Sequence, residues 1–202
     1  MVFFFLNNSF LKTTITLISN NLPAIVNTTA GTSKRVSIFI DGSNLYHSLV
    51  STFGSPKIDL DVFCKRITEN NEIIKINYYT APLNKNDNPS SYQSQQKFLS
   101  KIQKIPKLCV NFGRMEKREG TIVEKGVDVK LAVDMLLGAS KNEFDTAILV
   151  SNDADFVPAI IATQQLGKTV TNITFPKRKS YHLNQTSNHT IEITHEEKMQ
   201  YS

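Results

Sequence analysis

Short apolar runs alternate with helical patterns from Arg35 onward, and this alternation constrains the fold more than any other feature of the chain. A strand, a helix and a further strand form the repeating unit of proteins built on a parallel sheet. The sequence therefore predicts an α/β fold of three layers, with a central, mostly parallel sheet between two layers of helices. The predicted strands are residues 36–40, 73–80, 108–112, 147–150 and 169–174, and the predicted helices are residues 60–69, 91–104, 128–140 and 156–166.

Two of these strands, residues 36–40 and 147–150, are almost continuously aliphatic or β-branched. This pattern is typical of central strands that are buried on both faces, so we expect the two to be neighbours in the middle of the sheet. Asp59 is placed to cap the helix over 60–69, and Ser90 or Ser91 the helix over 91–104. The charged segment 114–125 is predicted to form a hairpin near the edge or mouth of the sheet.

The predicted domain covers residues 35–176. Residues 1–34 form an N-terminal extension to which no role is assigned, and residues 177–202 form a basic and then polar C-terminal tail that is expected to be mobile. The extension opens with an apolar run, but Asn7, Asn8 and Ser9 interrupt it early, which argues against a membrane span and against a secretory signal.

The composition allows a substantial core, with 40% hydrophobic and 20% charged residues. The net charge of +5 suits a polyanionic partner but supports nucleic acid only weakly. Cys64 and Cys109 lack any CxxC or Cys/His spacing, which argues against a zinc site or a disulfide scaffold. Both are expected to be buried as small hydrophobic residues, and a reducing cytoplasm is the predicted compartment.

Acidic residues follow both of the predicted central strands. Asp41 comes directly after residues 36–40, while Asp153 and Asp155 come shortly after residues 147–150. Taken singly, each could be a turn or a helix cap, but ligands of parallel sheets bind at the carboxyl ends of the strands. Two adjacent carboxylates 4 Å apart would repel each other by about 4 kcal/mol at an effective dielectric of 20, and a bound divalent cation would remove that penalty.

A third source of acids is the predicted helix that begins near Asp128. Asp134 follows six residues later, which on an ideal helix places the two side chains roughly 120° apart around the axis and about 9 Å apart along it. They are therefore not expected to bind the same ion. Asp128, at the start of the helix, is the preferred ligand, and Asp134 is expected to act through water or to orient a neighbouring group.

Three motifs together resemble the NYN family, also called the LabA-like or DUF88 group, within the PIN-like nuclease superfamily. They are Phe-Ile-Asp-Gly-Ser-Asn at 39–44, Lys-Gly-Val-Asp at 125–128 with Asp134, and Ser-Asn-Asp-Ala-Asp-Phe at 151–156. The resemblance covers residues 36–175. Asn152 stands where many relatives carry glycine, so a left-handed backbone is expected there.

The resemblance implies an endoribonuclease that depends on Mg²⁺ or Mn²⁺, ions that favour oxygen ligands and that would activate a water without a nucleophilic side chain. It also implies that RNA is the partner. No membrane is expected to be involved, and a homodimer is left open. Carried over to this sequence, the metal-binding and catalytic acids are Asp41, Asp128, Asp153 and Asp155, the polar supporting residues are Asn44 and Ser151, and Lys125 contacts phosphate.

Lys177 and Arg178 are further candidates for gripping RNA phosphates, although a solvated charged run explains them equally well. Two other functions stay open. The domain could be a non-catalytic RNA-binding or regulatory module. It could also be a phosphatase of the haloacid dehalogenase type, but that reading ranks lower because Ser43 stands where the nucleophile's partner Asp is required.

Overall fold

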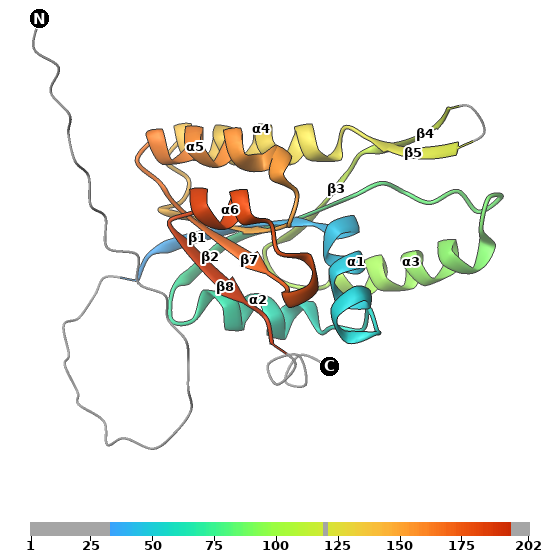
Figure 1. The fold of residues 1–202 in the computed structure, drawn as a ribbon. Helices are drawn as coiled ribbons and strands as arrows, with labels where there is room; N and C mark the ends of the chain where they lie inside the picture. The colour runs from blue at the N-terminus through green and yellow to red at the C-terminus, as the bar shows by residue number, and fades with distance from the viewer. Residues whose placement is uncertain (1–32, 119–120, 195–202) are drawn as a thin grey trace, which may run out of the picture. The chain divides into compact units, whose positions relative to one another are not determined.

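The computed structural model describes residues 33–118 and 121–194, and for residues 117, 118 and 121–123 it describes the backbone alone. In this part of the chain a six-stranded sheet has the order β3-β2-β1-β6-β7-β8, and every neighbouring pair in it is parallel (Figure 1). The strands are β1 (Arg35–Asp41), β2 (Glu72–Thr80), β3 (Leu108–Phe112), β6 (Thr146–Val150), β7 (Thr169–Thr174) and β8 (His189–Glu192). The predicted three-layer α/β fold is confirmed.

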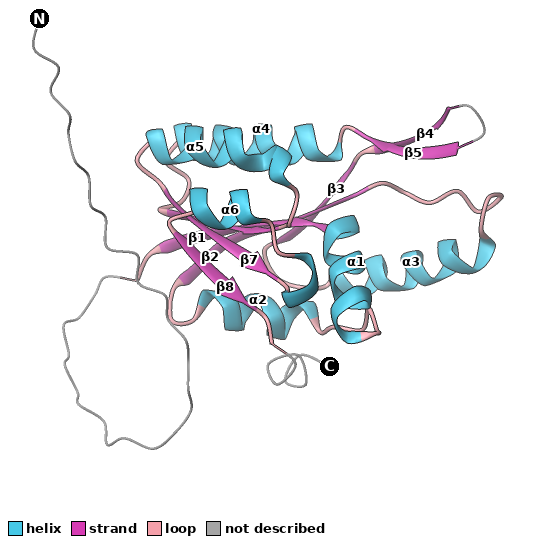
Figure 2. Cartoon of the chain, in the orientation of Figure 1, coloured by secondary structure: helices cyan, strands magenta, loops and turns pink. Residues whose placement is uncertain are grey.

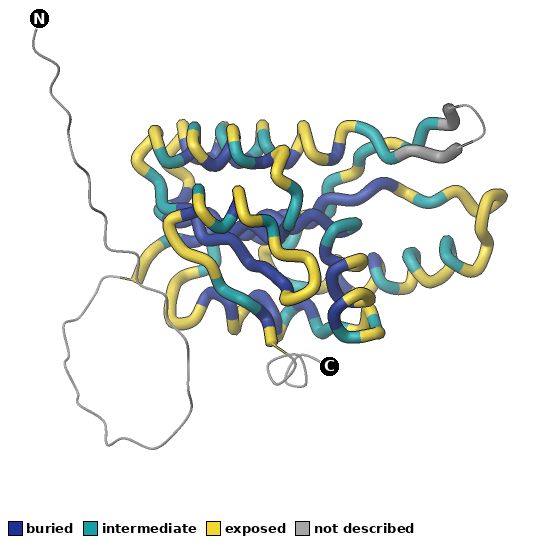
Figure 3. Tube along the Cα trace, viewed as in Figure 1, coloured by how far each residue is buried: buried dark blue, intermediate teal, exposed yellow. Residues whose placement is uncertain are grey.

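Helices cover both faces of the sheet (Figure 2). On one face lie α1 (Gly42–Phe53), α2 (Leu60–Thr68) and α3 (Pro89–Ile102), and on the other α4 (Val127–Ser140), α5 (Val157–Gln165) and α6 (Tyr181–Thr186). Alternate residues of β1 divide between the two cores: Ile38 and Ile40 pack with the first group of helices and Phe39 with the second. The sheet is consequently the most deeply buried layer of the molecule (Figure 3).

β1 and β6 are neighbours at the centre of the sheet, as predicted, with Val36 to Ile40 of β1 in register with Thr146 to Val150 of β6. Strand order runs outward in opposite directions from this pair, toward β3 on one side and β8 on the other. The carboxyl ends of β1 and β6 therefore flank the crevice where ligands of open parallel sheets bind.

The segment between β3 and α4 forms the predicted hairpin, with β4 (Arg114–Arg118) antiparallel to β5 (Thr121–Lys125). Asp59 caps α2 as expected, through its side chain and the backbone N–H groups of Asp61 and Val62. The predicted cap of α3, Ser90 or Ser91, is wrong by two or three residues. Asn88 caps it instead, accepting a hydrogen bond from the Ser91 backbone, and Pro89 opens the helix because its fixed φ suits the first helical position.

The chain continues the sheet beyond residue 176, where the sequence predicted a tail. A short 3-10 turn (Pro176–Arg178) leads into α6, and β8 then pairs with β7, so that Ile191 lies beside Ile173. These elements could not be predicted from the sequence because α6 has six residues and β8 only four, which is too few to show a periodic pattern. The N-terminal extension and the last residues of the tail lie outside the described part of the chain.

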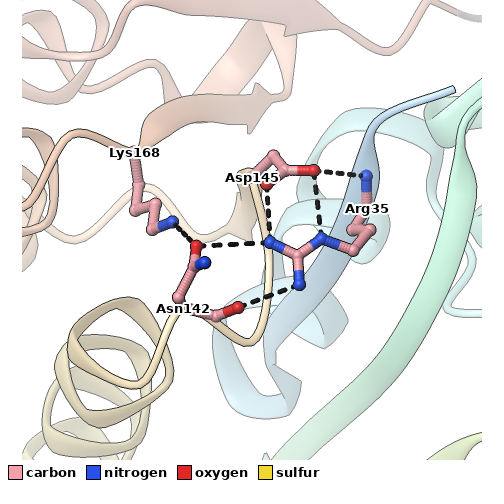
Figure 4. A network of polar contacts seen from close by, with 4 residues as sticks. All are labelled: Arg35, Asn142, Asp145 and Lys168. Atoms are coloured by element: carbon pink, nitrogen blue, oxygen red, sulfur yellow. Dashed lines mark hydrogen bonds and ion pairs between the residues drawn. The ribbon is translucent and has the colours of Figure 1, made fainter. Parts of the chain in front are cut away.

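A polar network ties the amino-terminal edge of the sheet together (Figure 4). The Arg35 guanidinium binds Asp145 with an N–O distance of 2.7 Å, and the Asp145 carboxylate also accepts the backbone N–H of Arg35. Asn142 accepts hydrogen bonds from Arg35 and from Lys168, which extends the network to the start of β7. This network joins β1, the turn after α4 and the turn before β7.

Cys64 is fully buried, as expected, but Cys109 is exposed on β3, an edge strand of the sheet, so the expectation for Cys109 is wrong. Among the described residues, no helix has the length and apolar character needed to cross a membrane.

Candidate functional site

Asp41 is the last residue of β1 and caps α1, so one residue ends a central strand and begins a helix. Its Oδ1 accepts the backbone N–H of Asn44 at 2.9 Å, and its Oδ2 accepts the Ser151 hydroxyl at 3.4 Å. The residue is 5% exposed. Burial raises the pKa of Asp41 to about 6, and the negative charges of Asp128 and Asp153 add to this rise.

Gly42 permits this arrangement by its lack of a side chain. An added Cβ would lie 2.5 Å from the Tyr78 hydroxyl oxygen and 2.7 Å from the Tyr79 carbonyl oxygen. The φ of Gly42 is not positive, so a left-handed backbone is not the reason for glycine at this position. Its role is a close approach between α1 and β2, and this approach keeps the Tyr78 side chain beside Asp41.

Asp153 and Asp155 follow β6 in a 3-10 turn, Ala154–Phe156, that leads into α5. Asp153 caps this turn through the backbone N–H of Asp155, and its own backbone N–H donates to the Ser151 hydroxyl oxygen at 3.1 Å. The Ser151 hydroxyl thus links Asp41 to the Asp153 backbone. Phe156, the last residue of this turn, is buried in the core.

Asp128 lies in the first turn of α4, which covers the other face of the sheet from α1, and it adds a negative charge to the site. Burial raises its pKa, and the charges of Asp153 and Asp155 contribute. The backbone reaches this position through Gly126, whose φ of 78° is left-handed and suits glycine. The acids of β1, α4 and the turn after β6 are therefore close enough to influence one another electrostatically.

Glu124 is a further acid of this site that the sequence analysis missed. It lies on β5, its Oε1 is buried without a hydrogen-bond partner among the described residues, and burial together with Asp41 and Asp128 raises its pKa to about 7. Glu124 directly precedes the Lys-Gly-Val-Asp motif, so its place beside this motif was a signal in the sequence. That Glu124 lies near the other acids became evident only from the register of the hairpin.

No Lys, Arg or His of the described residues forms an ion pair with these five acids. No three His, Cys, Asp or Glu side chains in residues 33–118 and 121–194 stand close enough together to hold one metal ion. The oxygen-only donor set nevertheless suits Mg²⁺, which usually takes one or two carboxylates and keeps several waters. A Mg²⁺ ion that binds one or two carboxylates and keeps its waters is compatible with the buried Asp41 carboxylate, which has no cation beside it among the described residues. An ion surrounded by protein ligands is not compatible with this arrangement.

Asn44 contributes a clamp between the two central strands. Its side-chain oxygen accepts the backbone N–H of Asn152 at 3.1 Å, and the Asn152 side chain reaches Ser48 and Thr174. Asn152 has a negative φ, so the left-handed backbone expected there is wrong. Its side chain instead joins α1, the end of β6 and the end of β7, which sets the positions of Asp41 and Asp153 relative to each other.

Asp134 is on α4 and lies apart from the five acids described above. Its Oδ2 accepts the Tyr79 hydroxyl at 3.1 Å and the Lys130 ammonium at 3.2 Å. It therefore ties α4 to β2, the strand that pairs with β1.

The basic candidates come from two separate segments of the chain. Lys125 ends β5 and pairs in register with Arg114, while Lys177 and Arg178 are exposed in the turn that follows β7. The structure brings Lys177 and Arg178 to the same edge as the acids, because they follow the carboxyl end of a parallel strand.

Comparison with known proteins gives a family and a fold. The NYN domain family profile matches residues 35–194, and no curated protein matches the chain. A Vibrio parahaemolyticus protein of unknown function shares the fold, with a TM-score of 0.68 and 23% identity over 81% of this chain and 94% of that one. A putative UDP-N-acetylglucosamine 2-epimerase from Listeria monocytogenes aligns with a TM-score of only 0.39 and 10% identity over 82% of this chain and 40% of that one.

The family match spans all six strands of the sheet and every acid of the crevice. It includes residues 177–194, in agreement with the continuation of the sheet through β8. The match does not separate the LabA-like group from other members. The chain belongs to the NYN domain family, a family of PIN-like nucleases.

Proposed function

We propose that the chain is a metal-dependent endoribonuclease that hydrolyses RNA phosphodiesters with Mg²⁺ or Mn²⁺. The observation that carries the proposal is the gathering of Asp41, Asp128 and Asp153 beside the crevice between β1 and β6, with no basic side chain of the described residues paired to them. Such a set of like charges destabilises the fold unless a cation binds, so it is better explained by a ligand than by packing.

One or two of the carboxylates of Asp41, Asp128, Asp153 and Asp155 would bind the metal directly, and the others would bind it through its water molecules. A bound divalent ion lowers the pKa of water and neutralises charge on phosphate oxygens. Glu124 joins these acids in the proposal, because a carboxyl whose pKa is near 7 can accept or donate a proton close to neutral pH.

The remaining side chains position these acids and the substrate. Ser151 holds Asp41 and the backbone of Asp153, and Asn44 with Asn152 fixes the spacing of the strands that carry them. Lys125, Lys177 and Arg178 would contact backbone phosphates, which gives binding without sequence preference and with a strong dependence on salt.

The test is cleavage of labelled single-stranded and structured RNAs by the purified full chain in Mg²⁺, in Mn²⁺ and in EDTA. Internal cleavage that requires a divalent ion is expected. Asp153→Asn should keep the fold and the cap of the 3-10 turn, because Asn is an equally good capping residue, and should lower the cleavage rate at least 100-fold.

Asp61→Asn is the matched control, since Asp61 is an acid on α2 that pairs with Lys65. It should leave cleavage unchanged. RNA binding without cleavage in either ion would instead identify a non-catalytic module, and phosphate release from small esters with RNA intact would identify a phosphatase. A fully active Asp153→Asn protein would contradict the proposed site.

A further inference from the structure

A hollow of about 560 Å³ opens between the segment that follows β2 and the first residues of β4. Pro82, Leu83 and Asp87 line one side, and Arg114 and Met115 line the other. β2 pairs with β1, whose last residue is Asp41, and neighbouring strands lie about 4.8 Å apart. The hollow is therefore at the same edge of the sheet as the acids, one or two strands away from them.

The β4–β5 hairpin connects the hollow to the acids. Met115, which lines the hollow, lies directly across the hairpin from Glu124, and the charges of Asp41 and Asp128 help to raise the pKa of Glu124. Residues directly opposite each other in an antiparallel pair lie on the same face. Figure 1 shows the hairpin and the segment leading from β2 into α3 projecting from the same end of the sheet.

The first wall of the hollow is held in place from α3. Gln95 accepts the Leu83 backbone N–H with its Oε1 and donates to the Ala81 carbonyl with its Nε2, both at 2.9 Å. On the other wall, the Gly113 N–H donates to the Thr80 carbonyl at 2.9 Å. Because these bonds fix the backbone on both sides, little ordering would be needed when a ligand binds.

The hollow combines apolar surface with two opposite charges that do not pair. Pro82, Leu83 and Met115 supply the apolar contacts. The side chains of Asp87 and Arg114 have no hydrogen-bond or ion-pair partner among the described residues. The complementary ligand has a flat apolar body, an anionic group and hydrogen-bond donors, a combination that a nucleotide provides.

We propose that this hollow binds a guanine nucleotide of the RNA strand next to the site of cleavage, a proposal that rests on the proposed ribonuclease function. Arg114 contacts the phosphate, Leu83 and Met115 contact the faces of the base, and Asp87 accepts hydrogen bonds from its edge. The nuclease would therefore prefer RNA with guanine at one position beside the scissile bond.

The carboxylate of Asp87 selects guanine among the four bases. Only guanine presents two donors side by side on its Watson–Crick edge, the N1–H and the exocyclic amine, and a carboxylate has two acceptor oxygens to match them. Adenine and cytosine place an acceptor nitrogen beside the amine, and uracil flanks its single N–H with two carbonyl oxygens. Each of these acceptors would repel the carboxylate.

The test measures binding separately from cleavage. Fluorescence anisotropy with the full-length Asp153→Asn protein in EDTA would compare labelled uridine-rich oligoribonucleotides that carry one central guanine, adenine, cytosine or uridine. The guanine oligonucleotide should bind about tenfold more tightly than the others. Equal affinity for all four would overturn the proposal.

Two variants and two controls refine the test. Asp87→Asn should remove the preference for guanine, whereas Arg114→Gln should weaken binding of all four oligonucleotides equally and reduce the salt dependence by about one phosphate contact. Asp61→Asn and Arg66→Gln, on α2 outside the hollow, should change neither property. A guanine preference that survives Asp87→Asn overturns the assignment of that residue.

Failure of this proposal is distinguishable from failure of the proposed function. Guanine preference that depends on Asp87, without cleavage by the wild-type protein, would uphold the hollow and reject the nuclease. Metal-dependent cleavage without guanine preference would reject the hollow and uphold the nuclease.

Discussion

The two edges of the sheet use aspartate in opposite ways. At the amino-terminal edge, hydrogen bonds from Arg35 lower the pKa of Asp145 to about 2 (Figure 4). At the carboxyl-terminal edge, burial raises the pKa of Asp41 to about 6, and the nearby charges of Asp128 and Asp153 add to the rise. The first carboxylate stabilises the fold and the second is held at a cost in stability. The difference supports the proposed site at the carboxyl-terminal edge, where the negative charge is left uncompensated.

The largest expected effect is on activity at the carboxyl-terminal edge. Asp41→Asn should lower metal-dependent RNA cleavage at least 100-fold, because the amide keeps the contact with the Asn44 backbone but cannot supply the negative charge. Cleavage rates under single-turnover conditions would measure the loss. Asp145→Asn is the matched control at the other edge and should cleave normally, so equal losses in both variants would abolish the distinction between the edges.

The next effect concerns the crowding around the acids. Gly42→Ala places a Cβ against the buried Tyr78 side chain and the Tyr79 backbone, and it should destabilise the protein by about 2–3 kcal/mol. Gly167→Ala, at the amino-terminal edge, adds a Cβ with nothing within 4 Å, so only its φ of 76° opposes the change and the cost should be about 1 kcal/mol.

Urea unfolding of the two alanine variants would compare these costs. If Gly42→Ala were the milder substitution, the close approach of α1 to β2 would not be a constraint on the site. A loss of cleavage in Gly42→Ala that exceeds its loss of stability would show in addition that the approach aligns Asp41.

The third effect has an unusual sign, since removing a site charge should stabilise the metal-free protein. The rise in the pKa of Asp41 from its ordinary 3.8 to about 6 corresponds to a penalty on the order of 3 kcal/mol near pH 7. Because Asn is also buried at some cost, Asp41→Asn should raise the free energy of unfolding in EDTA by about 1–2 kcal/mol.

The pH dependence of that gain tests its cause. A carboxyl whose folded pKa is raised binds its proton more tightly in the folded state, so stability falls as the pH rises from about 4 to about 6. Asp41→Asn should accordingly have its full advantage above pH 6 and should become slightly less stable than the wild type near pH 4, where only the cost of burying Asn is left. If the gain in stability stayed constant with pH, packing would be its cause. If Mg²⁺ abolished the gain, binding of the ion at Asp41 would be linked to it.

The sequence predicted the core of this site because its signal is local. Asp41 and Asp153 each follow an apolar run recognisable as a central strand, and parallel pairing then requires the two to lie close together. Asp128 was placed by the start of its helix. These inferences need only element type and order, which periodicity and the family motifs supply.

What the sequence did not predict depends on register and side-chain contacts. Glu124 joins the acids only because the hairpin pairs it with Met115, a register that charge and hydropathy do not determine. The clamp from Asn44 to Asn152 links residues 108 positions apart, so no spacing rule would reveal it. β8 was missed because four residues, of which one is isoleucine, carry too little pattern.

The smallest effect is expected for the amino-terminal network, where Asp145→Asn removes the charge that binds Arg35. The side chains of the pair are 38% and 42% exposed, so solvent screens it and the cost should be about 1 kcal/mol in the free energy of unfolding. A carboxyl whose folded pKa is lowered stabilises the protein above its unfolded pKa, so the wild-type advantage should shrink as the pH falls from about 4 to about 2. Thermal unfolding across this range would measure it. Since Asp41→Asn is the same chemical change with the opposite expected sign, destabilisation by both variants would show that the carboxyl-terminal acids contribute to stability as well.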